Sequence, residues 1–274
     1  MSFFEYVLRI FDLSMEQPQP YGWFHLLSLL LTVGLTVFLC FFCRKWPADH
    51  IRRLVLATAI TVVLLEIYKQ INFGFSYTDG IVFDYAWYAF PFQFCSTPMY
   101  VGLIAGLTKK GRLHNAACAY LATYAVFAGI CVMLYPTTVF INTIGINIQT
   151  MVCHGSMIVI GIYLLCSGYV KAEHKTLLRA MPVFGVCVLI AAVMNEIAYR
   201  SGLLTTDTFD MFFISPYTEP SLPVYSLVQK AVSFPWCLLL YLFGFSLAAY
   251  LILLVAMGIT RLAKKQQKES AGVV

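Results

Sequence analysis

Long apolar runs, separated by short polar and basic segments, dominate the chain. A membrane-spanning helix needs about 20 consecutive, mostly apolar residues. Spanning strands are excluded, because barrel strands alternate apolar and polar residues over only about 10 positions. The pattern therefore predicts an all-α polytopic membrane protein with seven transmembrane helices. These lie at 22–43, 53–73, 87–107, 115–135, 148–170, 180–199 and 234–259.

The first 20 residues have a pattern of their own. Five apolar residues within 2–15 recur near helical spacing, which predicts a short amphipathic helix on the membrane surface. This segment does not resemble a signal peptide, since it has neither a basic start nor an uninterrupted apolar run. The apolar residues are Phe3, Phe4, Val7, Leu8 and Phe11.

The longest segment outside the predicted helices is 200–233. It is rich in Thr, Ser, Pro and Asp, but it also contains Phe212, Phe213, Tyr217 and Tyr225. This composition is too apolar for a plain linker, so we expect it to fold back as a lid over the outer mouth of the helices. The chain then consists of the N-terminal segment 1–20, a seven-helix domain 21–260 and a basic tail 261–274.

Basic residues set the predicted orientation of these helices. Of the 18 Lys and Arg residues, 14 fall in alternate loops or in the tail. Basic loops stay in the cytoplasm, so the N-terminus is expected to be extracytoplasmic and the C-terminus cytoplasmic. The 14 residues are Arg44, Lys45, Arg52, Arg53, Lys109, Lys110, Arg112, Lys171, Lys175, Arg179, Arg261, Lys264, Lys265 and Lys268.

Composition narrows the class further. Only 11% of the 274 residues are charged, whereas a soluble domain carries roughly 25%. This excludes a soluble enzyme, a secreted disulfide scaffold and a disordered protein. The loop bias accounts for the net charge of +5, which is therefore no indication of a nucleic-acid partner. We expect a multi-pass protein of the cell membrane with lipids as partners.

The nine cysteines lie within or at the ends of the predicted helices. None lies in an extracytoplasmic loop, where a structural disulfide would form. Cys40 and Cys43 form a CFFC pair, but no His lies at metal-binding spacing, so packing is the better interpretation. The sequence gives no indication of a metal or a cofactor.

Polar residues within the helices gather in the predicted outer half. Ionisable side chains in a membrane helix are costly and usually face a cavity or a partner. We therefore predict a polar cavity near the outer face, although intrahelical pairing or solvation at helix ends also explains some of these positions. The predicted cavity residues are His25, Glu66, Lys69, Gln93, Cys95, Gln149, His154, Asn195 and Glu196.

Two features favour chemistry at this cavity. His154 is followed by Gly155 and Ser156, whose small size permits a neighbouring helix to approach the imidazole. In FPFQFCSTP, Pro91 and Pro98 bracket Cys95. Each proline removes a helical hydrogen bond, so we expect a twice-bent helix with a widened pocket at Gln93 and Cys95. Ordinary use of proline in membrane helices is the alternative.

From about residue 20 to 260 the chain resembles the YwaF-type family of bacterial seven-helix membrane proteins, which extends to vertebrate relatives regarded as lipid acyltransferases. The resemblance rests on His25-Leu26-Leu27, Glu66, Pro91 to Cys95, His154-Gly155 and Asn195. Bacterial members commonly have histidine where this chain has Gln93. This difference removes proton transfer at position 93 but leaves hydrogen bonding.

The resemblance implies a cysteine acyl carrier, Cys95, paired with a histidine base, His154. A thiol in an apolar site needs such a base to become nucleophilic. On this interpretation Glu66 or Glu196 orients the imidazole, and Lys69 or Gln93 stabilises the oxyanion.

Two other classes fit the same cavity. A transporter or small-molecule binding protein also uses polar helices interrupted by proline, although no internal repeat is visible. A receptor-like sensor is the third class, but the last predicted helix lacks the lysine that a retinal protein requires.

Overall fold

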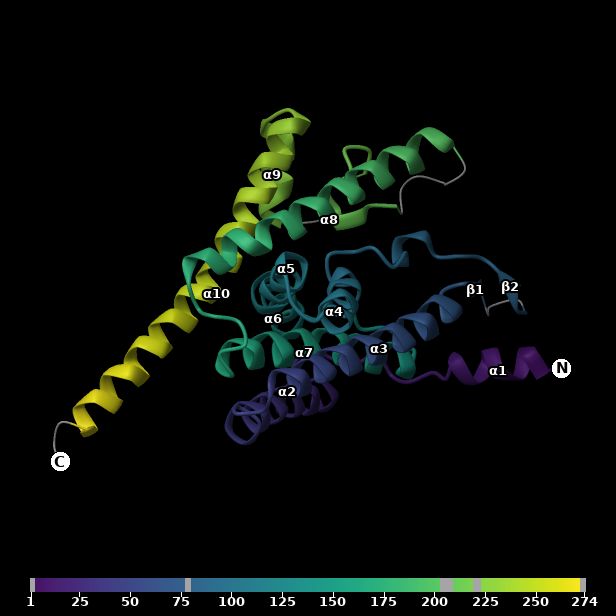
Figure 1. Cartoon of the computed structure of the whole chain (residues 1–274). Coiled ribbons are helices and arrows are strands. Elements are labelled where there is room, and N and C mark those ends of the chain that lie inside the picture. The colour runs from purple at the N-terminus through teal and green to yellow at the C-terminus, as the bar shows by residue number, and fades with distance from the viewer. Residues whose placement is uncertain (1–2, 77–79, 203–208, 219–222, 272–274) are drawn as a thin grey trace.

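The computed structural model describes residues 3–76, 80–202, 209–218 and 223–271 (Figure 1). It is built almost entirely of helices, as the apolar pattern predicts. The elements are α1 (Phe3–Phe11), α2 (Trp23–Phe42), α3 (Ala48–Asn72), β1 (Phe75–Ser76), β2 (Val82–Phe83), η1 (Trp87–Ala89), α4 (Thr97–Leu107), α5 (Arg112–Tyr120), η2 (Leu121–Ala125), α6 (Val126–Leu134), α7 (Ile144–Cys166), α8 (His174–Ser201), η4 (Met211–Phe213), α9 (Pro223–Ala231) and α10 (Phe234–Ala271).

Six helices among the described residues are long and apolar enough to cross a membrane. One of them is assembled from α5, η2 and α6, which run on without a break through a π-helical turn. Their large exposed apolar surface is what a lipid environment requires. A seventh, shorter apolar helix is α4, so the predicted count of seven spans stays a prediction. The six spans are Trp23–Phe42, Ala48–Asn72, Arg112–Leu134, Ile144–Cys166, His174–Ser201 and Phe234–Ala263.

The prediction of one twice-bent helix over 87–107 is wrong in its first half. A single 3-10 turn, η1, is followed by irregular backbone until α4 begins at Thr97. Pro98 occupies the first turn of α4, where no hydrogen bond is lost. The carbonyls of Trp87 and Phe94 are not orphaned either: the first accepts the Phe90 N–H at 3.1 Å and the second the Thr97 hydroxyl at 3.0 Å.

Hydrogen bonds between helix ends define two ends of the bundle. At the first, which carries β1 and β2, the Tyr21 hydroxyl donates to the Leu134 carbonyl at 2.6 Å. At the second, the Arg52 guanidinium donates to the Gly106 carbonyl at 2.7 Å and Tyr163 donates to the Cys43 carbonyl at 2.7 Å. We call them the hairpin end and the basic end. Which end faces the cytoplasm stays a prediction.

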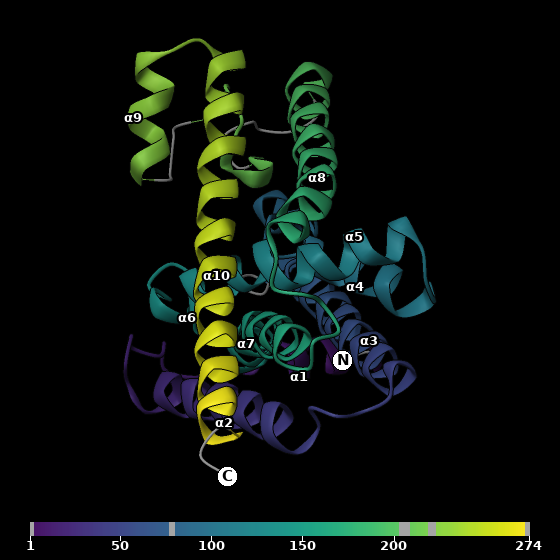
Figure 2. The same ribbon diagram turned by 60° about the vertical axis from the view of Figure 1, so that its left-hand side comes forward.

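The helix predicted near the N-terminus is confirmed at Phe3–Phe11. It is fastened to the hairpin end of α3, because the Phe11 carbonyl accepts hydrogen bonds from Tyr68 and Asn72. Figure 2 shows α8 and α10 upright beside each other, with α9 folded against the first part of α10.

An aromatic core joins α8 and α10 to the rest of the bundle. The ring of Phe184 stacks on Tyr124 at 4.4 Å and on Tyr241 at 6.1 Å. Segment 209–218 is part of the same core, since Phe212 is fully buried and its carbonyl accepts the Tyr241 hydroxyl at 3.0 Å. The predicted backward fold of 200–233 is therefore present in this part, whereas 203–208 and 219–222 lie outside the described residues.

Candidate functional site

A buried ion pair marks the hairpin end of α3. Lys69 Nζ lies 2.7 Å from Glu66 Oε1, and the two side chains are 14% and 6% exposed. Glu66 also accepts the amide hydrogens of Gln70 at 2.7 Å and of Gln149, on α7, at 3.3 Å. A buried charged pair persists only when further hydrogen bonds satisfy it. The pair is thus part of a network between α3 and α7, more than the self-contained intrahelical pair that spacing alone allows.

The network continues to the surface through Gln70. Its amide nitrogen donates to the Ala89 carbonyl at 2.8 Å, and its oxygen accepts the Tyr85 hydroxyl. Burial raises the pKa of Tyr85 to about 12, so this phenol stays protonated and donates at neutral pH. Glu66, Gln70 and Tyr85 line a pocket of about 560 Å³, whose other walls are mainly apolar side chains. We call this hollow the polar pocket.

Cys95 lies in the turn that leads into α4. Its carbonyl accepts the Cys153 thiol at 3.8 Å, which places α7 directly beside it. The charges of Lys69 and Glu66 both act on the Cys95 thiol. The first N–H groups of α4 are already used, because Ser96 and Thr97 donate to the Gln93 carbonyl at 2.8 and 3.1 Å.

His154 follows Cys153 on α7 and is 5% exposed. Its Nδ1 lies 2.7 Å from the Thr150 carbonyl, which fixes Nδ1 as the protonated nitrogen. Nε2 is buried and has no hydrogen-bond partner among the described residues. The ring therefore presents an unoccupied basic lone pair, which is the state that a general base requires.

Small residues bring neighbouring helices close to His154, as the sequence predicts. A side chain at Gly155 would lie 2.6 Å from the Thr32 hydroxyl of α2, and one at Gly129 would lie 2.7 Å from the His154 carbonyl. Thr150 orients the imidazole, in place of the expected Glu66 or Glu196. Within the described part of the chain no hydrogen bond joins His154 to Cys95.

Gln93 and Asn195 have a task that the sequence does not reveal. Gln93 donates to the Asp210 carbonyl and accepts the Phe212 N–H, both at 3.0 Å. Asn195 donates to the Met211 carbonyl at 3.0 Å and accepts its N–H at 2.8 Å. The two amides hold three consecutive residues of segment 209–218 over the turn that contains Cys95.

The remaining two predicted residues lie elsewhere. His25 is fully buried between α2 and α6, where Nδ1 accepts the Tyr21 N–H at 2.8 Å and Nε2 donates to the Met133 carbonyl at 2.9 Å. Both ring nitrogens are occupied, so His25 joins two helices. Glu196 is partly exposed and pairs with Arg200 and Tyr217.

Sequence reasoning missed several polar neighbours. Gln70 follows Glu66 by four residues, a spacing that predicts the contact. Tyr85 carries no such signal, because it comes from the far side of the hairpin. A second cysteine and histidine, Cys118 and His114, lie in contact at the basic end, with Sγ 3.6 Å from Nε2. Their four-residue spacing in α5 was the available signal.

No group of three His, Cys, Asp or Glu side chains among the described residues is arranged to hold a metal ion. The groups near the polar pocket are instead one thiol, one neutral imidazole and one ion pair.

The spanning helices and the polar pocket define a multi-pass helical membrane protein. A family model, that of the TMEM164 family, matches residues 20–265, and the chain therefore belongs to the TMEM164 family. Comparison with curated proteins and with solved structures gave no match.

Proposed function

We propose that the protein is a membrane lipid acyltransferase that carries the acyl group on Cys95 and uses His154 as its base. The observation that supports this most is the state of His154. Its Nδ1–H is fixed by Thr150 and its Nε2 lone pair is buried and unoccupied, one residue from the cysteine that contacts Cys95. An imidazole with only a packing role would have both nitrogens occupied, as His25 has.

The first half-reaction transfers an acyl group from a phospholipid to Cys95. His154 Nε2 takes the thiol proton, and the thiolate sulfur attacks the ester carbonyl. When the tetrahedral intermediate collapses, the C–O bond breaks and the leaving alkoxide takes the proton from His154. The products are a thioester on Cys95 and a lysophospholipid.

The second half-reaction reverses these roles. His154 takes the proton of an acceptor hydroxyl, such as that of a different lysophospholipid, whose oxygen attacks the thioester carbonyl. The C–S bond breaks, and the sulfur leaves as thiolate and is reprotonated by His154. Neither half-reaction needs an oxidant or a nucleotide.

Lys69 is the better of the two expected oxyanion donors. Gln93 has its amide hydrogen-bonded to segment 209–218 on both sides. Lys69 uses one of its three hydrogens on Glu66 and its charge acts on both Cys95 and His154. A fixed positive charge beside the reacting carbonyl stabilises the transition state more than the ground state.

The polar pocket suits an amphipathic substrate. Glu66, Gln70 and Tyr85 offer hydrogen-bonding groups on one wall, and Val63, Ile67 and Leu103 offer hydrocarbon on another. Its volume of about 560 Å³ is in the range of small-molecule sites. We place the glycerol and ester groups of the lipid at the polar wall, at the extracytoplasmic leaflet that the loop charges predict.

Acyl exchange between a phospholipid and an isotopically labelled lysophospholipid, in vesicles that contain the purified protein, tests the proposal. Cys95→Ser is expected to abolish exchange, and Cys131→Ser, which changes an exposed thiol on α6, to preserve it. Full exchange by Cys95→Ser would overturn the proposal. The same pocket would then favour a transporter or a lipid-binding protein.

A further inference from the structure

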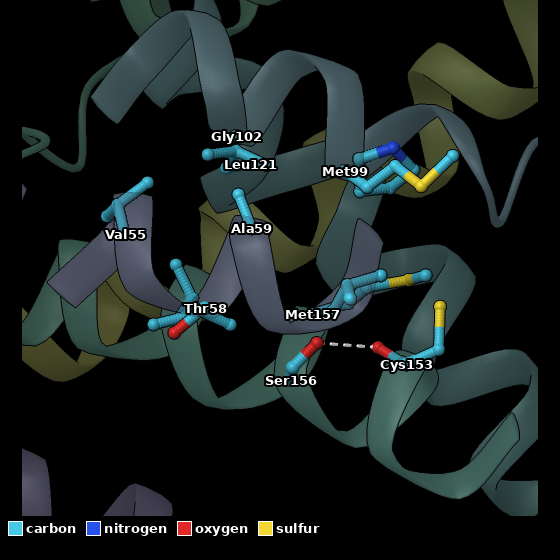
Figure 3. Close-up of a pocket in the computed structure, with 12 residues that line it drawn as sticks. Val55, Thr58, Ala59, Met99, Gly102, Leu121, Cys153, Ser156 and Met157 are labelled. Carbon is cyan, nitrogen blue, oxygen red and sulfur yellow. Dashed lines mark hydrogen bonds between the residues drawn. The ribbon is translucent and has the colours of Figure 1, made fainter. Parts of the chain in front are cut away.

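Three hollows follow one another around α3. The first is the polar pocket, on the side of α3 that faces α4 and the hairpin. The second, the inner cavity, has about 30 Å³ between α3, α4 and α7 (Figure 3). The third, which we call the lateral groove, has about 260 Å³ between α2, α3 and α7.

Neighbouring hollows share their walls. Met99 lines both the polar pocket and the inner cavity. Thr58, Ser156 and Ile160 line both the inner cavity and the lateral groove. Side chains alone therefore separate the three hollows, and one of the two separations is a methionine, whose unbranched side chain changes rotamer readily.

The hydroxyls in the lateral groove do not offer binding groups to a polar ligand. Ser28 and Thr32 donate to the carbonyls four residues before them at 2.9 and 2.8 Å, and Ser156 donates to the Cys153 carbonyl at 2.7 Å. The other walls are mainly Leu, Val, Ile and Met side chains. A water molecule needs two or more polar partners, so the chemistry of the groove matches a hydrocarbon.

The inner cavity begins beside the proposed acyl carrier. Cys153 lines the cavity, and its thiol donates to the Cys95 carbonyl at 3.8 Å. In Figure 3 the side chains of Cys153, Met157 and Met99 lie on the same side of the cavity, away from Val55. A chain attached at Cys95 thus meets the cavity within its first carbons.

We propose that the inner cavity and the lateral groove form a channel for one acyl chain of the lipid substrate. The chain passes from Cys95 along Met99, crosses α3 at Thr58 and Ser156, and ends in the groove between α2 and α7. The inference rests on the proposed function for the attachment at Cys95. The occupant is a flexible fatty acyl chain, because the narrow cavity admits a single file of methylenes but no rigid ring system.

Photo-crosslinking locates the chain without depending on acyl transfer. The probe is a phosphatidylcholine with a diazirine near the end of one acyl chain, in nanodiscs with the purified full-length protein, and labelled peptides are identified by mass spectrometry. Labelling is expected in the groove at Leu35 and Val159. Cys95→Ser is expected to keep this labelling, so that failure of the acyl-carrier proposal leaves a distinct result.

Thr58→Phe fills the junction between cavity and groove. We expect groove labelling to fall about fivefold or more, since forcing extra volume into a packed site carries a penalty of that size. Thr61→Phe is the matched control, because Thr61 is exposed on the same helix and lines neither hollow. Ser156→Leu, which enters the junction from α7, is expected to repeat the loss in case Thr58→Phe does not fold.

Labelling of lipid-facing positions such as Leu64, which is 61% exposed on α3, is expected to stay constant in every variant. Groove labelling that persists in both Thr58→Phe and Ser156→Leu would overturn the channel. An equal loss in Thr61→Phe would overturn it too, because the groove would then fill from the surrounding bilayer.

Discussion

The amide of Gln149 donates a hydrogen bond to Oε2 of Glu66 across 3.3 Å, joining α7 to α3. Oε1 of the same carboxylate contacts the Lys69 ammonium at 2.7 Å. The charge that acts on Cys95 is therefore tied to the helix that carries His154. A change at Glu66 is expected to affect both the stability of the helix pair and the reaction.

Glu66→Gln leaves the Lys69 charge buried without its counterion. We expect a loss of about 3–5 kcal/mol in the free energy of unfolding, the usual result of removing one member of a buried pair. Glu66→Gln combined with Lys69→Met is expected to recover most of it, as denaturant unfolding in micelles measures. A double variant that loses the sum of the single changes would contradict this interpretation.

The partly exposed pair Glu196 and Arg200 provides the control for that experiment. It also lies within one turn of a helix, on α8, but water screens it. Glu196→Gln with Arg200→Met should therefore leave the unfolding midpoint nearly unchanged.

The two histidines are expected to respond in opposite ways. His25→Ala leaves the Tyr21 N–H and the Met133 carbonyl unpaired, which costs about 1–3 kcal/mol for each buried group. Exchange activity per folded molecule should stay close to that of the parent. His154→Ala should abolish exchange with little change in stability. Thermal unfolding and acyl exchange on the same preparations distinguish the two, and a stable, active His154→Ala would contradict the assignment of the base.

Gln93→Leu removes two hydrogen bonds to segment 209–218. The Phe212 N–H loses its partner, so its hydrogen exchange should accelerate, and Asn195→Leu should have the same effect at Met211. Mass spectrometry of a peptide that spans 209–218 measures this. Gln17→Leu serves as control, since that amide contacts the distant Phe140 carbonyl. Unchanged exchange in Gln93→Leu would show that packing alone holds the segment.

Asp210 gives this segment a pH dependence. Burial raises the pKa of its carboxyl above the ordinary 3.8, although the Ser215 N–H and the Thr218 hydroxyl partly oppose the shift. A raised pKa means that the folded state holds the proton more tightly than the unfolded state. The stability that Asp210 contributes is therefore greatest below pH 3.8 and declines as the pH rises through its folded pKa.

Asp210→Asn removes this dependence. The difference in melting temperature between Asp210→Asn and the parent should become more favourable to the variant between about pH 3.5 and pH 7. A difference that is constant with pH, or that changes in the opposite direction, would show that the carboxyl is not the titrating group.

The apolar runs predicted most of the helices because hydrocarbon burial requires long, uninterrupted apolar segments. The segment 87–96 could not be predicted in the same way, since its composition is as apolar as a helix. Its irregular path depends on tertiary partners, such as the Tyr100 hydroxyl that donates to the Pro91 carbonyl at 2.8 Å. Proline indicated the interruption but not its extent.

The site was predictable where chemistry and depth coincide. Glu66, Lys69 and Gln149 were expected together and lie in contact. His25 was expected with them because it has similar depth, but depth does not define which face of a helix a residue occupies. Gln93 and Asn195 were expected as cavity residues, and their partner lies in a segment whose path the sequence pattern does not specify.

Mass spectrometry of the intact protein after incubation with phospholipid vesicles tests the central claim most directly. The account predicts one added acyl group on Cys95, released by neutral hydroxylamine as a thioester is. The adduct should be absent from Cys95→Ser and from His154→Ala, and present in Cys131→Ser. An adduct of equal abundance in Cys95→Ser, or none in the parent under conditions where lipid exchange proceeds, would contradict an acyl carrier at Cys95.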